Sequence, residues 1–172
     1  MNEVLNCLKT RRSVKKYKST PVPEEKLNAI LEAGTYAPSG KNKQSALIVC
    51  VTEPEAVKEL SKLNASILGA DIDPFYGAPC VAVVFADSTF FTHIEDGSLV
   101  MGNMLNAAHS LGVDSCWIHR AKEMFETDEG KALMKKWGVP EKYLGIGNCI
   151  LGYADCDYPT APERKDGYII KV

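Results

Sequence analysis

The sequence has no apolar stretch long enough to cross a membrane and no excess of charge of either sign. A membrane-spanning helix needs about 20 mostly apolar residues in a row, and the 172-residue chain contains no such run. Its first residues also lack the basic flank, apolar centre and small-residue cleavage site of a secretory signal. With 20 basic and 22 acidic residues the formal charge is −2, which argues against non-specific binding to nucleic acid. These absences predict a cytoplasmic protein with no membrane or nucleic-acid partner.

The six cysteines include no C-x-x-C pair, and the three histidines share no metal-ligand spacing. Most of the cysteines lie inside apolar segments such as Val49-Cys50-Val51, which is typical of buried free thiols in a reducing compartment. We therefore expect no disulfide and no zinc or other metal site.

Familiar nucleotide-binding and hydrolase motifs are also missing. The sequence contains no Walker A segment, no G-x-S-x-G elbow and no H-E-x-x-H. Gly145-Ile146-Gly147 lacks the third glycine of a dinucleotide-binding fingerprint and comes before a predicted strand, not after one. We therefore expect the chemistry to belong to a bound group.

Apolar periodicity and capping residues predict alternating helices and strands in one domain that spans residues 1–172. Helical spacing predicts helices over residues 3–9, 24–33, 54–63, 95–111 and 128–137. Apolar runs predict strands over residues 46–51, 80–86, 113–118 and 148–153, the first of them covered on both faces. Gly34 is expected to end the second helix, and Gly97 and Gly102 to let another helix approach the fourth. This pattern is typical of an α/β or α+β sandwich.

Two polar segments stand out against this apolar framework. The first, Arg11-Arg12-Ser13-Val14-Lys15-Lys16-Tyr17, follows the first predicted helix and carries four cations and the Ser13 hydroxyl within its first six residues. Such a cluster suits a ligand with a phosphate at one end and a polarisable acceptor nearby, but it also suits a solvated helix end. The second segment, residues 36–44, is a polar loop that leads into the first buried strand, where ligand contacts are frequent.

Several motifs recur in an order that resembles the nitroreductase family of flavin enzymes. They are Arg11-Arg12-Ser13-x-Lys15, Ala37-Pro38-Ser39 with Asn42 and Gln44, a long helix that ends in Leu111-Gly112, Cys116-Trp117-Ile118, Ile150-Leu151-Gly152-Tyr153, and the late Pro162-x-Arg164-Lys165. The resemblance implies a homodimeric α+β fold, a three-layer sandwich whose central, mostly antiparallel sheet is flanked by helices. It also implies one FMN at each of two sites between the subunits.

The resemblance assigns expected roles to individual residues. Arg11 and, from the tail, Arg164 and Lys165 would hold the FMN phosphate. Arg12 and Ser13 would contact the ribityl chain or pyrimidine edge. Lys15 would lie near N1 and O2 of the ring, where negative charge accumulates on reduction. The remaining cofactor-binding residues would be Pro38, Ser39, Gly40 and Asn42 of the partner, and Trp117, Ile118 and His119.

The implied activity is a ping-pong transfer of hydride from NADH or NADPH, through flavin N5, to a nitroaromatic, quinone or related small acceptor. No residue is certain to be catalytic, and whether His119 donates a proton is left open. The family often has Gln-Pro-Trp where this chain has Gln44-Ser45-Ala46, so a bulky residue near the loop is missing. The physiological acceptor and the preferred nucleotide are therefore open. A non-catalytic flavin-binding protein and a member that acts on a non-nitro substrate are the alternatives.

Overall fold

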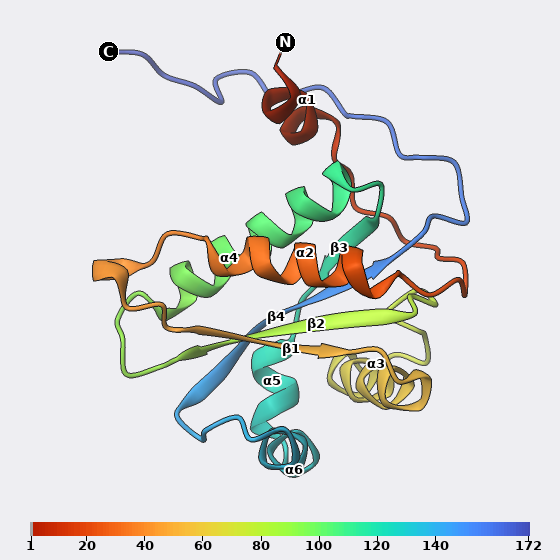
Figure 1. The fold of residues 1–172 in the computed structure, drawn as a ribbon, viewed down its shortest axis with the longest axis vertical. Coiled ribbons are helices and arrows are strands. Elements are labelled where there is room, and N and C mark those ends of the chain that lie inside the picture. The colour runs from red at the N-terminus through yellow and green to blue at the C-terminus, as the bar shows by residue number, and fades with distance from the viewer. Residues whose placement is uncertain (1) are drawn as a thin grey trace.

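The fold is built on one four-stranded antiparallel sheet. The structure is a computed structural model that describes residues 2–172. Its strands are β1 (Ala46–Val51), β2 (Cys80–Asp87), β3 (Asp114–Ile118) and β4 (Tyr143–Gly152). They lie in the order β1-β2-β4-β3, and every neighbouring pair is antiparallel (Figure 1). The first and third strands therefore form the two opposite edges of the sheet.

The edge position of β1 overturns the expectation that this strand is covered on both faces. Five of its six residues are only half-buried, whereas all eight residues of β2 are buried. An apolar run identifies a strand, but it does not tell an edge strand from a central one.

Helices cover both faces of the sheet and make three layers (Figure 1). On one face lie α2 (Glu24–Thr35) and α4 (His93–Ser110), and on the other lie α3 (Pro54–Leu68), α5 (Ala121–Glu126) and α6 (Asp128–Trp137). A short 3₁₀ turn, η1 (Gly40–Asn42), precedes β1. The predicted three-layer α+β sandwich with an antiparallel sheet is confirmed.

Local signals placed several helix ends correctly. The helix α1 (Glu3–Thr10) begins where the Asn2 side chain accepts a hydrogen bond from the Leu5 amide at 2.9 Å. The helix α6 begins where Thr127 caps the Gly130 amide, and it ends at Gly138, whose φ is +71°. The helix α3 extends to Leu68, further than predicted, and α5 was not predicted.

Two glycine predictions are wrong because these glycines are packing positions. Gly34 lies inside α2, where a Cβ atom would come within 2.9 Å of the Met104 side chain. Gly97 faces a strand, not a helix, since a Cβ there would come within 2.6 Å of Ile146 on β4. Nothing lies within 4 Å of the corresponding position on Gly102 in the single chain.

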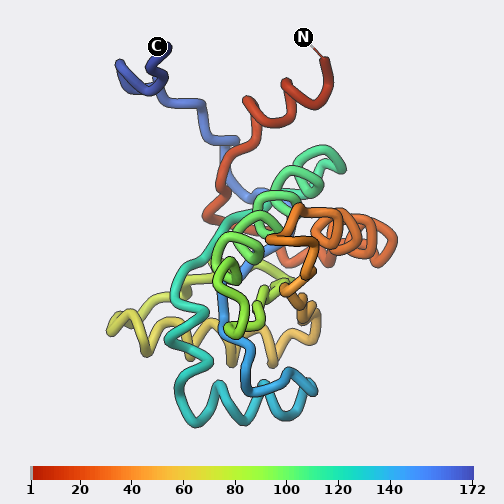
Figure 2. The backbone as a smooth tube through the Cα atoms, turned by 90° about the vertical axis from the view of Figure 1, so that its left-hand side faces the viewer, coloured from red at the N-terminus to blue at the C-terminus, as the bar shows by residue number. Residues whose placement is uncertain are grey.

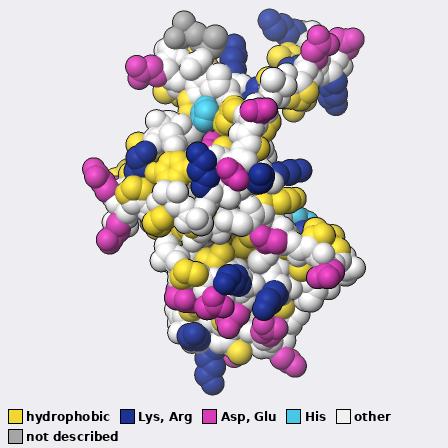
Figure 3. Space-filling view, turned by 90° about the vertical axis from the view of Figure 1, so that its right-hand side faces the viewer, with side chains coloured by type: hydrophobic (Ala, Val, Ile, Leu, Met, Phe, Trp, Pro, Cys, Tyr) yellow, Lys and Arg dark blue, Asp and Glu magenta, His cyan; other side chains and the backbone are white. Residues whose placement is uncertain are grey.

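The two chain ends project together from one end of the molecule. Figures 2 and 3 show α1 and the C-terminal tail as two arms above the body. The helix α1 has no buried residue, and Val4 is 68% exposed. Residues 155–172 are exposed throughout, with Ile170 at 82%. Across residues 2–172, no helix combines the length and the hydrophobicity that crossing a membrane requires.

Candidate functional site

The basic segment after α1 is extended and lies against the edge strand β3. Ser13 forms a parallel bridge with Ser115, and the Val14 amide donates to the Ser115 carbonyl at 3.2 Å. Val14 is fully buried, whereas Ser13 and Lys15 are exposed. Because side chains alternate along an extended chain, the buried valine turns Ser13 and Lys15 to the opposite side. The segment therefore presents a hydroxyl and an ammonium along one sheet edge.

The two arginines of this segment carry polar atoms that have no partner. The Nη1 atom of Arg11 and the Nε atom of Arg12 are buried, and neither has an acceptor within residues 2–172. The Nη1 atom of Arg12 donates to the carbonyl of Arg11 at 2.5 Å. A buried cationic donor without an acceptor is costly, so such atoms are expected to meet an anion. These two guanidinium groups therefore suit a ligand that carries a phosphate and further hydrogen-bond acceptors.

Tyr158 of the C-terminal tail contacts the backbone of this basic segment. The Tyr158 hydroxyl accepts from the Arg12 amide at 3.0 Å and lies 3.2 Å from Nδ1 of His109. The other ring nitrogen of His109 lies 2.8 Å from the Thr10 hydroxyl. Burial lowers the pKa of His109, opposed by Asp114 and assisted by Arg11, which favours the neutral ring. The sequence analysis missed this contact because Tyr158 and His109 are far apart in the chain and match no motif.

The basic pair of the tail bonds within the tail itself. The guanidinium of Arg164 donates to the Pro162 carbonyl at 2.7 Å and 3.2 Å. The Lys165 ammonium lies 5.3 Å from the centre of the Tyr168 ring. The placement of Arg164 and Lys165 at a phosphate therefore stays a prediction.

The end of β3 and the residue that follows it, segment 117–119, are held from inside the fold. The Trp117 indole packs on Gly147, where a Cβ atom would come within 2.8 Å of its Cε2. Ile118 is buried and His119 is exposed. The carbonyl of His119 accepts a hydrogen bond from the side chain of Asn64 at 2.8 Å. Because Ser115 and Trp117 belong to one short strand, this segment and the basic segment form one continuous region along β3.

The neighbouring thiol, that of Cys116, is buried. Burial raises the pKa of Cys116, which Ser13, Lys15 and Arg11 oppose only in part. All six cysteines are free, as predicted from the sequence.

The polar loop between α2 and β1 lies elsewhere, at the far end of α2 and α4 (Figure 1). It contains Pro38, Ser39, Gly40 and Asn42. The Ser39 hydroxyl accepts from the Gln44 amide at 2.9 Å. Lys41, Asn42 and Gln44 all have left-handed backbone conformations, with φ between +48° and +52°. Such a loop persists only where its surroundings hold it.

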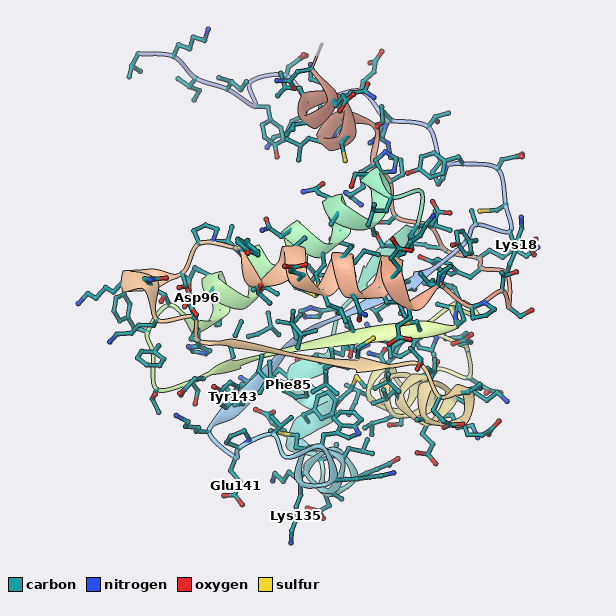
Figure 4. All side chains as sticks on the ribbon, viewed as in Figure 1. Lys18, Phe85, Asp96, Lys135, Glu141 and Tyr143 are labelled. Atoms are coloured by element: carbon teal, nitrogen blue, oxygen red, sulfur yellow. The ribbon has the colours of Figure 1, made fainter. Side chains whose placement is uncertain are left out.

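The buried carboxylate of Asp96 holds the middle of this loop and the end that leads into β1. One of its oxygens accepts from the Gly40 amide at 2.9 Å, and the other accepts from the Ser45 hydroxyl at 2.6 Å and from Thr92 at 3.3 Å. Figure 4 shows Asp96 where the loop meets the start of α4. Burial opposes its ionisation, but the hydrogen bonds from Ser45, Gly40 and Thr92 outweigh this and lower the pKa of Asp96.

A cavity of about 420 Å³ opens beside the loop, between α2, β1 and α4. Its wall includes Ser45 and Ala46, the positions where the sequence analysis found a bulky residue missing. The apolar side chains of Leu31, Ile48 and Val100 complete much of the lining. This volume lies within the range of small-molecule sites.

One chain therefore brings together only part of the predicted site. The segments 11–15 and 117–119 meet along β3, whereas the loop 38–42 lies at the other end of α2 (Figure 1).

Comparisons with known proteins agree with this fold. A model of the nitroreductase family matches residues 8–70 and 70–153. A solved nitroreductase with bound FMN from Bacteroides fragilis superposes with a TM-score of 0.90, at 32% identity and over 100% of both chains. An NADPH-flavin oxidoreductase of Vibrio harveyi is 27% identical, in an alignment that covers 99% of this chain and 73% of the length of that protein. An NADH dehydrogenase of Thermus thermophilus is 40% identical, in an alignment that covers 82% of this chain and 63% of the length of that protein. The chain belongs to the nitroreductase family.

Proposed function

We propose that this protein is an NAD(P)H-dependent oxidoreductase that binds FMN and reduces a small organic acceptor. The observation that carries the proposal is the pair of buried guanidinium atoms of Arg11 and Arg12 that lack an acceptor beside β3. The FMN in the solved relative from Bacteroides fragilis supports the identity of the ligand. Bound FMN supplies hydride chemistry, and the protein supplies binding and orientation.

The residues along β3 have distinct proposed roles. Arg11 binds the phosphate through charge-assisted hydrogen bonds, joined by Arg164 and Lys165 of the tail. Arg12 and Ser13 contact the sugar chain or the pyrimidine edge, and Lys15 lies beside the ring. The backbone of Trp117, Ile118 and His119 borders the other end of the ring. Exposed His119 is open to solvent, so solvent protons reach the site with or without it.

We further propose that the complete site needs a second copy of the chain. The loop with Pro38, Ser39, Gly40 and Asn42 lies away from Arg11 within one chain, so the loop of a partner would cover the flavin. The exposed apolar side chains of α1 and of the tail support this assembly, because such surfaces mark interaction sites. They are Val4, Leu5, Leu8, Ile169 and Ile170.

The lining of the cavity beside the loop is evidence for an electron acceptor with an aromatic ring. Its walls are mainly apolar, and Glu32 lines it together with the neutral side chain of Gln44. Nitroaromatic and quinone acceptors fit these properties.

The visible absorption spectrum tests the proposed function. The purified protein, incubated with FMN and freed of excess, is expected to be yellow and to bleach on anaerobic addition of NADH or NADPH. A protein that stays colourless would contradict the assignment of FMN as the cofactor and every residue role given above. Colour without bleaching would show a flavin carrier instead of a reductase.

Replacing Lys15 is expected to change the redox potential of bound FMN more than its binding. Lys15→Ala removes a positive charge proposed to face the ring, so it should lower the two-electron potential by roughly 30 mV, equivalent to about 1.4 kcal/mol. Lys16→Ala is the matched control, because Lys16 is the next residue and pairs with Asp155 at 3.3 Å. Potentiometric titration measures both, and an unchanged potential in Lys15→Ala would take this role from Lys15.

A further inference from the structure

The turn that ends β3 contains an arginine in a conformation that favours glycine. Arg120 has φ +73° and ψ +11°, in the left-handed region. A bulky residue pays a steric cost there that glycine does not pay. A strained residue of this kind persists when its surroundings over-determine it.

The side chain of Arg120 is tied to a fully buried asparagine. Its Nε and Nη2 atoms both donate to Oδ1 of Asn64, at 3.0 Å and 2.9 Å. Asn64 lies on α3 and has no exposed surface. With its amide nitrogen the same side chain donates to the His119 carbonyl at 2.8 Å. Asn64 therefore binds the two residues on either side of one peptide bond.

A second buried asparagine acts on the same carbonyl. The amide nitrogen of Asn148, on β4, lies 3.4 Å from the His119 carbonyl and 3.3 Å from the Ile118 carbonyl. Asn148 is also fully buried. The His119 carbonyl is therefore directed into the fold by side chains from two different elements.

The direction of this carbonyl determines the direction of the adjoining amide. The His119–Arg120 peptide is trans, as are all peptides of the described chain. In a trans peptide the C=O and N–H bonds point in opposite directions. The Arg120 N–H therefore points out of the fold, and it has no acceptor among residues 2–172.

We propose that Arg120 and Asn64 are positioning residues of the flavin site. Their hydrogen bonds offset the strain of the left-handed turn and hold the Arg120 N–H outward, where bound FMN can accept it. This inference rests on the proposed function, since it needs FMN beside residues 117–120. It assigns the arginine side chain a role inside the fold and no contact with the flavin.

Two substitutions at one position separate strain from side-chain chemistry. Arg120→Ala keeps the left-handed backbone strain and removes the hydrogen bonds to Asn64 that offset it. FMN binding is therefore expected to weaken about tenfold, because the strain of one such residue shifts an equilibrium by roughly that factor. Arg120→Gly removes both the tie and the strain, so it should bind FMN within about twofold of the wild type. Lys122→Ala is the control, because it removes an exposed cation from α5, the short helix that follows Arg120.

The test combines fluorescence titration with FMN, the visible spectrum of the saturated protein and the thermal melting of each apoprotein. A loss of affinity and an altered flavin band in Arg120→Ala, both restored in Arg120→Gly, would support the proposal. Equal affinities in Arg120→Ala and wild type would overturn it, and so would a glycine variant as impaired as the alanine variant. In these cases the wild type still binds FMN and bleaches with nucleotide, so the proposed function stands. A wild type that binds no FMN would overturn both.

Discussion

Arg11→Ala is expected to weaken FMN binding about 100-fold, the largest effect of any single substitution along β3. A charge-assisted hydrogen bond contributes roughly 1.5–3 kcal/mol, and one guanidinium can make two such bonds to a phosphate. The buried Nη1 atom of Arg11 has no acceptor within residues 2–172, so its full donor capacity is free for a ligand. Fluorescence titration with FMN measures the loss.

The same substitution should not destabilise the protein without FMN. In most proteins, removing a buried arginine breaks contacts, but here it also removes an uncompensated buried donor. The apoprotein of Arg11→Ala is therefore expected to melt within a few degrees of the wild type. Affinity for riboflavin, which has no phosphate, should change far less than affinity for FMN. Lys9→Ala is the matched control, since Lys9 is an exposed cation near the end of α1, two residues before Arg11. An FMN affinity unchanged in Arg11→Ala contradicts the phosphate role.

Asp96→Ala is expected to destabilise the protein by about 3 kcal/mol, because it leaves buried donors without an acceptor. The carboxylate accepts from the Gly40 amide and from the Ser45 hydroxyl, and it is only 2% exposed. Since these bonds hold the middle of the loop and its end before β1, the proposed covering of the flavin by this loop should be lost as well. Chemical denaturation measures the free energy of unfolding. Glu95→Ala is the control, because Glu95 is the adjacent, exposed acid of the same helix turn. Equal stabilities of the two variants would contradict the role of Asp96.

The Asp96 contribution should also depend on pH in a defined direction. Hydrogen bonds lower the pKa of Asp96 in the folded protein despite its burial. A carboxyl group with a lowered folded pKa stabilises the fold above its unfolded pKa, about 3.9, and this stabilisation is lost as the pH falls through the folded value. The stability difference between wild type and Asp96→Asn is therefore expected to be constant near neutral pH and to narrow in acid.

Mixing the two impaired proteins tests whether the site is shared between subunits. In a mixed dimer of Arg11→Ala and Asp96→Ala chains, one site combines both defects. The other site combines an intact Arg11 with an intact loop. Co-expression should therefore restore tight FMN binding at one of the two sites. No restoration in a verified mixed dimer would show that each site is built from one chain.

Local sequence signals predicted the parts of the fold that depend on neighbouring residues. Asn2 and Thr127 cap helices where expected, and the strand 46–51 has the predicted bounds, because capping and apolar runs act over a few residues. The ordered motifs from Arg11 to Lys165 were enough to indicate the family. The same signals misread Gly34, since a glycine that ends a helix and one that packs against Met104 look alike in a sequence.

Contacts between distant segments were decided only by the tertiary structure. Asp96 lies 56 residues from Gly40, and Arg120 lies 56 residues from Asn64, so neither pair forms a motif that a reader could find. In the sequence, Asp96 is one acid at the start of a helix and Arg120 is one surface cation. Asp96 contacts the loop only because α4 packs against that loop. Arg120 contacts Asn64 only because α3 lies beneath the end of β3. The sequence alone indicated which side chains are expected to meet FMN, because the residues within each motif are close together in the chain. The tertiary structure decided what holds those residues in place, since buried hydrogen bonds form wherever the fold brings donors and acceptors together.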